Sequence, residues 1–128
     1  MNTENATDLN EITSAIIGAA QTVSATLGCG FLEKIYENAL ALELRLRGHE
    51  VRQQQAVDVR YRQEIVGDYV ADLIVDRRVI VELKAMPCLE AVHKAQCLNY
   101  LRATGMRLAL LLNFGRPKLE VRRVISGY

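Results

Sequence analysis

Charged side chains interrupt two apolar segments near the middle of the chain. Asp72 lies in the segment GDYVADLIVD, and Glu82 and Lys84 lie in the segment VIVELKA. If both segments are β-strands, the alternation of side chains places Glu82 and Lys84 on one face of their strand. A carboxylate and an ammonium group therefore project together from an otherwise apolar surface.

The relation between Asp72 and Glu82 depends on the turn that joins the two segments. A three-residue turn over residues 76–78 would pair Val75 with Val79 and set Asp72 opposite Glu82. A turn with an even number of residues would place the two carboxylates on opposite faces. We expect the three-residue turn, and with it a pair of facing carboxylates.

Facing carboxylates on an apolar surface repel each other and lose hydration, so a positive charge must compensate. Lys84 supplies one such charge. A bound Mg²⁺ or Mn²⁺ would supply a stronger one, since hard divalent cations prefer carboxylate oxygens and water. Such a site suits metal-assisted hydrolysis of a phosphodiester, with Lys84 orienting the attacking water or stabilising developing charge. A surface pair of Glu82 and Lys84 without any function would explain the same spacing.

The elements that hold these side chains follow from the hydrophobic period, which changes along the chain. The sequence predicts helices over residues 9–27, 31–47 and 89–104, and strands over residues 55–61, 65–75, 79–85, 107–113 and 118–125. Asp8 and Glu11 have the spacing of a capping box at the start of the first helix. Polar turns at residues 62–64 and 76–78 make the first three strands an antiparallel meander.

Length and composition favour one soluble globular domain. The chain has 128 residues, of which 50% are hydrophobic and 24% are charged. We expect a flexible N-terminus over residues 1–8, which lacks the features of a secretory signal, and a single domain over residues 9–128. No apolar run approaches the roughly 18 residues that would suggest a membrane span.

The cysteines and histidines do not suggest a zinc site. Cys29, Cys88 and Cys97 are an odd number without CxxC spacing, as expected for reduced thiols in a cytoplasmic protein. His49 and His93 lie far apart in the sequence, and we expect His93 to be an exposed helical residue. The C-terminal third is the basic part of the chain, which favours a nucleic-acid partner only weakly.

Four separated motifs match a known family. GFLEKIY at residues 30–36 has the pattern Gly-x-x-Glu-x-x-Tyr, made by Gly30, Glu33 and Tyr36. DLIV begins at residue 72, VELKA at 81 and AQCLNYLRATG at 95, and LLNFG follows at 111. With these motifs in this order, the sequence resembles the GxxExxY protein family from about residue 9 to residue 125. That family belongs to the PD-(D/E)xK nuclease superfamily.

The resemblance implies an α/β (α+β) fold of the restriction-endonuclease-like kind. Its core has the order α-β-β-β-α-β, to which this chain adds an N-terminal helix and a C-terminal strand. Asp72 and Glu82 are then metal ligands and Lys84 is catalytic, as the D, E and K of the signature. Ala71 stands where the signature's name has proline, a residue that would remove a hydrogen-bond donor from a strand.

The resemblance also implies roles outside these two strands. Glu33 corresponds to an additional acid of the metal site, and Gln96 and Tyr100 correspond to polar positions of the following helix. Their i, i+4 spacing places Gln96 and Tyr100 on one face. Glu37 could replace Glu33 as the third acid. Tyr36 and Tyr100 could instead be core aromatics, Gln96 could bond to a neighbouring backbone group, and Gly30 permits the turn between the first two helices.

The resulting prediction is a Mg²⁺-dependent or Mn²⁺-dependent nuclease that acts on DNA or, less favoured, RNA. The alternative is a noncatalytic module that keeps the nuclease fold and binds nucleic acid or protein. We expect no membrane association. A homodimer or a partner subunit would give a chain of this size more surface for its substrate.

Overall fold

The computed structural model describes the backbone of residues 2–127 and the side chains of residues 9–127. The elements are α1 (Asn2–Leu27), α2 (Glu33–Leu46), β1 (Val51–Tyr61), β2 (Glu64–Val75), β3 (Val79–Lys84), α3 (Ala91–Thr104), β4 (Leu108–Asn113) and β5 (Glu120–Ile125). Their types and order confirm the order predicted from the sequence. None of the helices in the described part of the chain is long and apolar enough to cross a bilayer.

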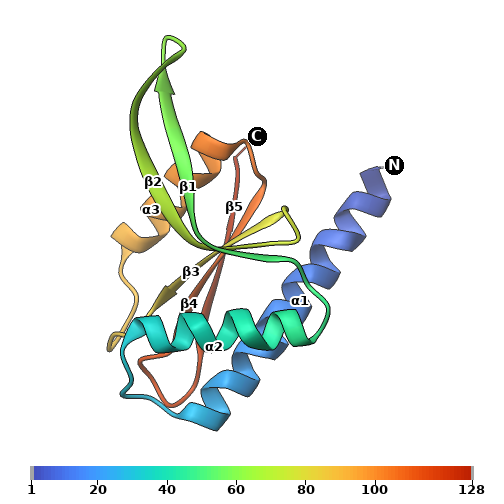
Figure 1. The fold of residues 1–128 in the computed structure, drawn as a ribbon, viewed down its shortest axis with the longest axis vertical. Coiled ribbons are helices and arrows are strands. Elements are labelled where there is room, and N and C mark those ends of the chain that lie inside the picture. Colours follow the sequence, from blue (N-terminus) through green and yellow to red (C-terminus); the bar gives the residue numbers. More distant parts are fainter. Residues whose placement is uncertain (1, 128) are drawn as a thin grey trace.

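The strands form one sheet in the order β1-β2-β3-β4-β5. The first three strands are an antiparallel meander, as predicted, and β5 is antiparallel to β4. β3 and β4 are parallel, because α3 carries the chain back across the sheet between them. The crossover leaves the C-terminal ends of β3 and β4 side by side at one edge of the molecule (Figure 1).

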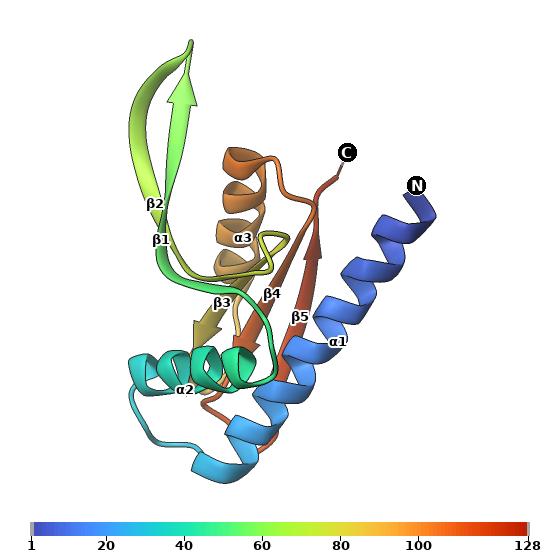
Figure 2. The same ribbon diagram turned by 45° about the vertical axis from the view of Figure 1, so that its right-hand side comes forward.

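Helices cover both faces of the sheet (Figures 1 and 2). α1 and α2 pack on one face through a buried cluster that includes Tyr36, Leu73 and Leu83. α3 packs on the other face through a second cluster that includes Ala71 and Ile80. Each face of the sheet therefore contributes to its own hydrophobic core.

The first helix begins earlier than the sequence indicated. α1 starts at Asn2 and so includes residues 2–8, for which we expected a flexible segment. Asp8 lies inside the helix, so the predicted capping box with Glu11 is wrong. Residues 2–8 contain neither Pro nor Gly, and no residue there stops the helix from extending.

The hairpin of β1 and β2 extends beyond the other strands (Figure 2). Its turn has two residues, Arg62 and Gln63, both with positive φ, rather than the predicted three residues. β1 begins at Val51, earlier than expected. The first residues of β1 are mostly polar and do not show the alternation typical of a strand. They form a strand because they pair with the apolar end of β2.

The side chains of the hairpin change faces near its base, about a third of the way along β1. Val51 and Val57 are six positions apart, so regular alternation would place them on one face, yet they belong to opposite core clusters. On β2, Leu73 and Ala71 are divided between the clusters in the same way. The reversal occurs where Gln54 and Asp72 face each other, and Gln54 has a φ of 51°. The unusual backbone conformation of Gln54 therefore lies next to the predicted site, although the pairing register is the same on both sides of it.

Candidate active site

The ladder between β2 and β3 ends just before the predicted carboxylate pair. Val75 pairs with Val79 and Ile74 with Ile80, which confirms the three-residue turn, and the last pair is Leu73 with Val81. Beyond this pair, side-chain carboxylates accept the hydrogen bonds that link the two strands. The backbone N–H of Asp72 donates to Glu82 Oε2 at 2.9 Å, and the backbone N–H of Leu83 donates to Asp72 Oδ2 at 2.9 Å. Each carboxylate is therefore held by the backbone of the other strand.

Burial makes this pair of carboxylates costly to ionise. Glu82 is only 6% exposed. Burial, followed by the charge of Asp72, raises the pKa of Glu82 to about 8. The pKa of Asp72 is also raised, mainly by burial, although the Leu83 N–H opposes the shift. Two acids that resist simultaneous ionisation are suited to sharing a bound cation.

Lys84 is the cation that acts on this group from β3. Its side chain is half-buried, and its charge lowers the pKa of Glu33, Asp72 and Glu82 against the effect of burial. Lys84 and the three acids therefore form one electrostatic cluster, although they come from α2, β2 and β3.

Glu33 and Glu37 differ in their surroundings. Glu33 is exposed at the first position of α2, and partial burial followed by the charges of Asp72 and Glu37 raises its pKa. Glu37 is only 3% exposed, and its carboxylate accepts from Lys34 Nζ, Gln53 Nε2 and Gln54 Nε2. The donors around Glu37 favour a structural role for it and leave Glu33 as the more available acid.

Gln54 is a site residue that the sequence did not predict. It lies opposite Asp72, between the pairs Gln53–Leu73 and Gln55–Ala71. Its Nε2 donates to Glu37 Oε1 at 2.8 Å and to Asp72 Oδ1 at 3.3 Å. Its positive φ is uncommon for a residue other than glycine and indicates backbone strain. In the sequence, Gln54 is the middle of three consecutive glutamines, and nothing in this run distinguishes it from its neighbours.

Helix α3 contributes the aromatic edge of the site. Tyr100 is 8% exposed, and burial followed by the charges of Glu82 and Asp72 raises its pKa to about 12. Its hydroxyl donates to the carbonyl of Val70 at 3.4 Å. Gln96 is exposed whereas Tyr100 is buried, so Tyr100 is the one of the two that packs against the sheet.

His93 is buried, contrary to the expectation of an exposed helical residue. Its Nδ1 accepts from the N–H of Glu90 at the start of α3, and this contact draws the ring onto the protein.

Gly30 and Tyr36 support the start of α2. Gly30 has a φ of 114°, a conformation that favours glycine. Tyr36 is fully buried, its hydroxyl donates to the carbonyl of Gly28 at 2.6 Å, and it accepts from the N–H of Phe31 at 3.1 Å. Both residues shape the loop that presents Glu33.

The family comparison agrees with this architecture. A family model described as the PD-(D/E)XK nuclease superfamily matches residues 10–124, which is most of the chain. The chain belongs to this superfamily. No curated protein and no solved structure matches it. The five-stranded sheet with its helices is consistent with the restriction-endonuclease-like fold predicted from the sequence.

PD-(D/E)XK nucleases typically use divalent metal ions. Among the described residues, no three His, Cys, Asp or Glu side chains are grouped closely enough to hold a metal ion by themselves. Mg²⁺ does not require such a cage, because it is usually bound by one or two carboxylates together with waters and substrate phosphates. The paired oxygen donors of Asp72 and Glu82, whose ionisation a cation would favour, therefore fit this kind of ion.

Proposed function

We propose that this protein is a nuclease that hydrolyses phosphodiester bonds of DNA, with RNA as the less favoured substrate, and that it requires Mg²⁺ or Mn²⁺. One observation carries the proposal. Asp72 and Glu82 are each held by a backbone N–H of the opposite strand, so both carboxylates are fixed at the point where the ladder opens. Fixed carboxylates support catalysis because they need little reorganisation when charge develops.

Asp72 and Glu82 would hold the ion, and Glu33 would complete the acidic cluster directly or through water. The bound ion would polarise the scissile phosphate and lower the pKa of the attacking water. Lys84 would orient that water and stabilise the negative charge that develops on the phosphate. Water would lose a proton to solvent and add its oxygen to phosphorus, the bond from phosphorus to the leaving oxygen would break, and that oxygen would take up a proton from solvent.

Tyr100 and Gln96 complete the proposed site from α3. The raised pKa of Tyr100 keeps its phenol protonated, so it would act as a hydrogen-bond donor or a positioning group rather than as a base. Gln96 is exposed and would contact the nucleic acid. Gly30, Glu33 and Tyr36 support assignment to the GxxExxY family within the superfamily.

The remaining expectations are part of the same proposal. Residues 9–128 would act as a single nuclease-like domain, as a homodimer or with a partner subunit. The three free cysteines are compatible with a reducing cytoplasmic environment.

The test combines metal binding with cleavage. Mg²⁺ and Mn²⁺ are titrated calorimetrically into the wild type and Asp72→Asn, and cleavage of single-stranded, duplex and branched DNA and of RNA is followed with and without EDTA. Asp68→Asn is the matched control, because Asp68 is exposed on the same strand away from the site. We expect metal binding and cleavage in the wild type and the control, and loss of both in Asp72→Asn.

Lys84→Ala separates chemistry from metal binding. It should retain metal binding and lose about 100-fold or more in cleavage rate, as for removal of one proton-transfer or charge-stabilising group. Absence of cleavage in every substrate, together with salt-dependent nucleic-acid binding that survives Lys84→Ala, would contradict the nuclease proposal. That result would favour the noncatalytic binding module.

A further inference from the structure

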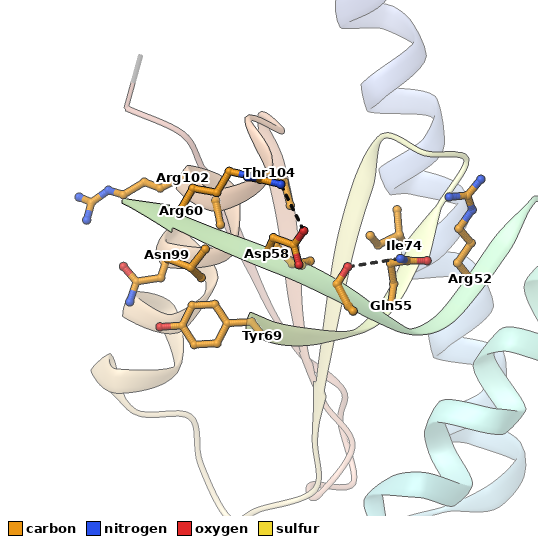
Figure 3. A pocket seen from close by; sticks show the side chains of 13 residues that line it. Arg52, Gln55, Asp58, Arg60, Tyr69, Ile74, Asn99, Arg102 and Thr104 are labelled. Carbon is orange, nitrogen blue, oxygen red and sulfur yellow. Dashed lines mark hydrogen bonds and ion pairs between the residues drawn. The ribbon is translucent and has the colours of Figure 1, made fainter. Parts of the chain in front are cut away.

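A groove separates α3 from the hairpin of β1 and β2 (Figure 3). It has a volume of about 810 Å³ and opens to solvent. Side chains from both elements line it, including Arg52, Gln55, Arg60, Tyr69, Asn99 and Arg102. The groove is distinct from the acidic cluster, and none of the roles proposed for that cluster uses it.

The lining of the groove is basic. Arg52 and Arg60 contribute guanidinium groups from β1, and Arg102 contributes one from α3. Asp58 is the one acid among the described lining residues, and it lies 3.8 Å from Arg60. Arg52 lies 3.8 Å from Glu50, which is outside the lining. The side chains of Arg52 and Arg60 are 46% and 57% exposed, so a ligand can reach both guanidinium groups, and three arginines face two acids. The groove therefore carries an excess of positive charge.

At one end of the groove, an edge-to-face pair of tyrosines connects it to the site. Tyr69 lines the groove, is 38% exposed, and packs edge to face on Tyr100 with the ring centroids 5.0 Å apart. The Tyr100 hydroxyl in turn donates to the carbonyl of Val70 at 3.4 Å, and Val70 lies two residues before Asp72 on β2. A ligand in the groove would thus continue toward the acidic cluster.

We propose that this groove binds a single-stranded stretch of the nucleic-acid substrate next to the bond that is cleaved. The inference rests on the proposed function and extends it to the substrate class. Guanidinium groups pair with phosphates, and an exposed tyrosine stacks on an unpaired base. A duplex keeps the faces of its bases stacked inside, where Tyr69 could not reach them. Single-stranded DNA and RNA share this chemistry.

Binding is measured by fluorescence anisotropy in EDTA, so that it does not depend on catalysis. The probes are labelled oligothymidylate, labelled oligouridylate and a labelled DNA duplex. The test variant is Arg60→Ala/Arg102→Ala. The control is Lys118→Ala/Arg123→Ala, which removes two positive charges from the α1 side of the sheet, where Lys118 lies near Gln21 and Arg123 contacts Asn10.

The groove variant should bind both single strands about tenfold more weakly at low salt than the wild type. The slope of log K against log salt should fall in magnitude by about 1.4, which corresponds to two lost phosphate contacts on a single strand. Tyr69→Leu should weaken binding, and Tyr69→Phe should retain it, because stacking needs the ring and not the hydroxyl. Stronger binding of one probe identifies DNA or RNA as the preferred strand.

Three results would overturn the inference. They are equal weakening by the control variant, equal or tighter binding of the duplex with the same losses, and absence of binding to either single strand. The nuclease proposal fails separately, by absence of metal-dependent cleavage. If the wild type cleaves nucleic acid but the groove variant binds single strands as well as the wild type does, the proposed function stands and the proposed role of the groove is wrong.

Discussion

The carboxylate of Glu82 is buried beside a second carboxylate, so its ionisation must affect the stability of the folded protein. Its pKa rises from 4.5 to about 8 on folding, so between these values the folded state binds more protons than the unfolded state. The free energy of unfolding therefore falls as the pH rises through this window. Below about pH 4.5 the effect disappears, since Glu82 is protonated in both states.

Glu82→Gln should remove this dependence while keeping an oxygen that accepts from the Asp72 N–H. We expect it to be more stable than the wild type at pH 8 by a few kcal/mol, about one for each unit of pKa shift, and to differ much less at pH 4.5. Urea unfolding at both pH values without added metal measures the difference. An equal change at the two values, or a similar gain from Glu64→Gln on the exposed hairpin, would contradict the interpretation.

Gln54 combines a strained backbone with two hydrogen bonds to acidic side chains. Gln54→Ala and Gln54→Gly both remove these bonds and should raise the Mg²⁺ concentration needed for half-maximal cleavage, because Asp72 loses a partner that orients it. Glycine tolerates a φ of 51°, so Gln54→Gly should be about 1 kcal/mol more stable than Gln54→Ala.

Gln55 supplies the control for that comparison. Its Nε2 donates to the carbonyl of Ala56, and its φ is not positive. Gln55→Ala should be at least as stable as Gln55→Gly, which is the reverse of the order at Gln54. The same order at both positions, measured by urea unfolding, would show that strain at Gln54 is unimportant.

Among the elements, the end of β3 is hydrogen-bonded to the end of β4 and to the loop that follows β4. The N–H of Phe114 donates to the carbonyl of Lys84 at 2.8 Å, and the side chain of Asn113 bonds to both the N–H and the carbonyl of Met86. Gly115 allows this approach, because a Cβ there would lie 2.2 Å from the Met86 backbone. The motif LLNFG therefore holds the strand that carries Lys84.

Gly115→Ala should force this loop away from β3 and destabilise the protein by about 1–3 kcal/mol, the usual cost of overpacking. Cleavage should fall as well, because the Phe114 contact positions the backbone of Lys84. Gly67→Ala is the control, since a Cβ at Gly67 meets no atom within 4 Å. Thermal unfolding of the two variants checks the prediction, and similar melting temperatures would contradict it.

At the scale of the whole molecule, metal binding should stabilise the fold, because the acids come from separate elements and are brought together only in the folded state. A ligand that binds only the folded state adds about 1.4 kcal/mol at ten times its dissociation constant. The Tm of the wild type should therefore rise with Mg²⁺ or Mn²⁺. Asp72→Asn should show no such rise, and Asp68→Asn should behave like the wild type. Equal shifts in all three proteins would indicate a general salt effect.

Local patterns predicted the element types, their order and the register between β2 and β3, but not the two-residue turn between β1 and β2. Alternation along GDYVADLIVD and VIVELKA, with a three-residue turn between them, placed Asp72 beside Glu82, since strand pairing extends directly from its turn. The start of α1 and the first part of β1 were not predicted. Asp8 is a residue type that often caps helices, but it lies inside α1. The start of β1 is mostly polar and forms a strand because it pairs with the apolar end of β2.

Spacing along one hairpin was enough to predict the strands that carry Asp72, Glu82 and Lys84 and the facing of the two carboxylates, because strand pairing extends directly from a short turn. The distant groups that join them are known only from the fold. The change of faces at Gln54, the burial of Glu37 and His93, and the groove between α3 and the hairpin all depend on packing between elements far apart in the chain. Local periodicity carries no information about such contacts, because it reports only which side of an element is apolar.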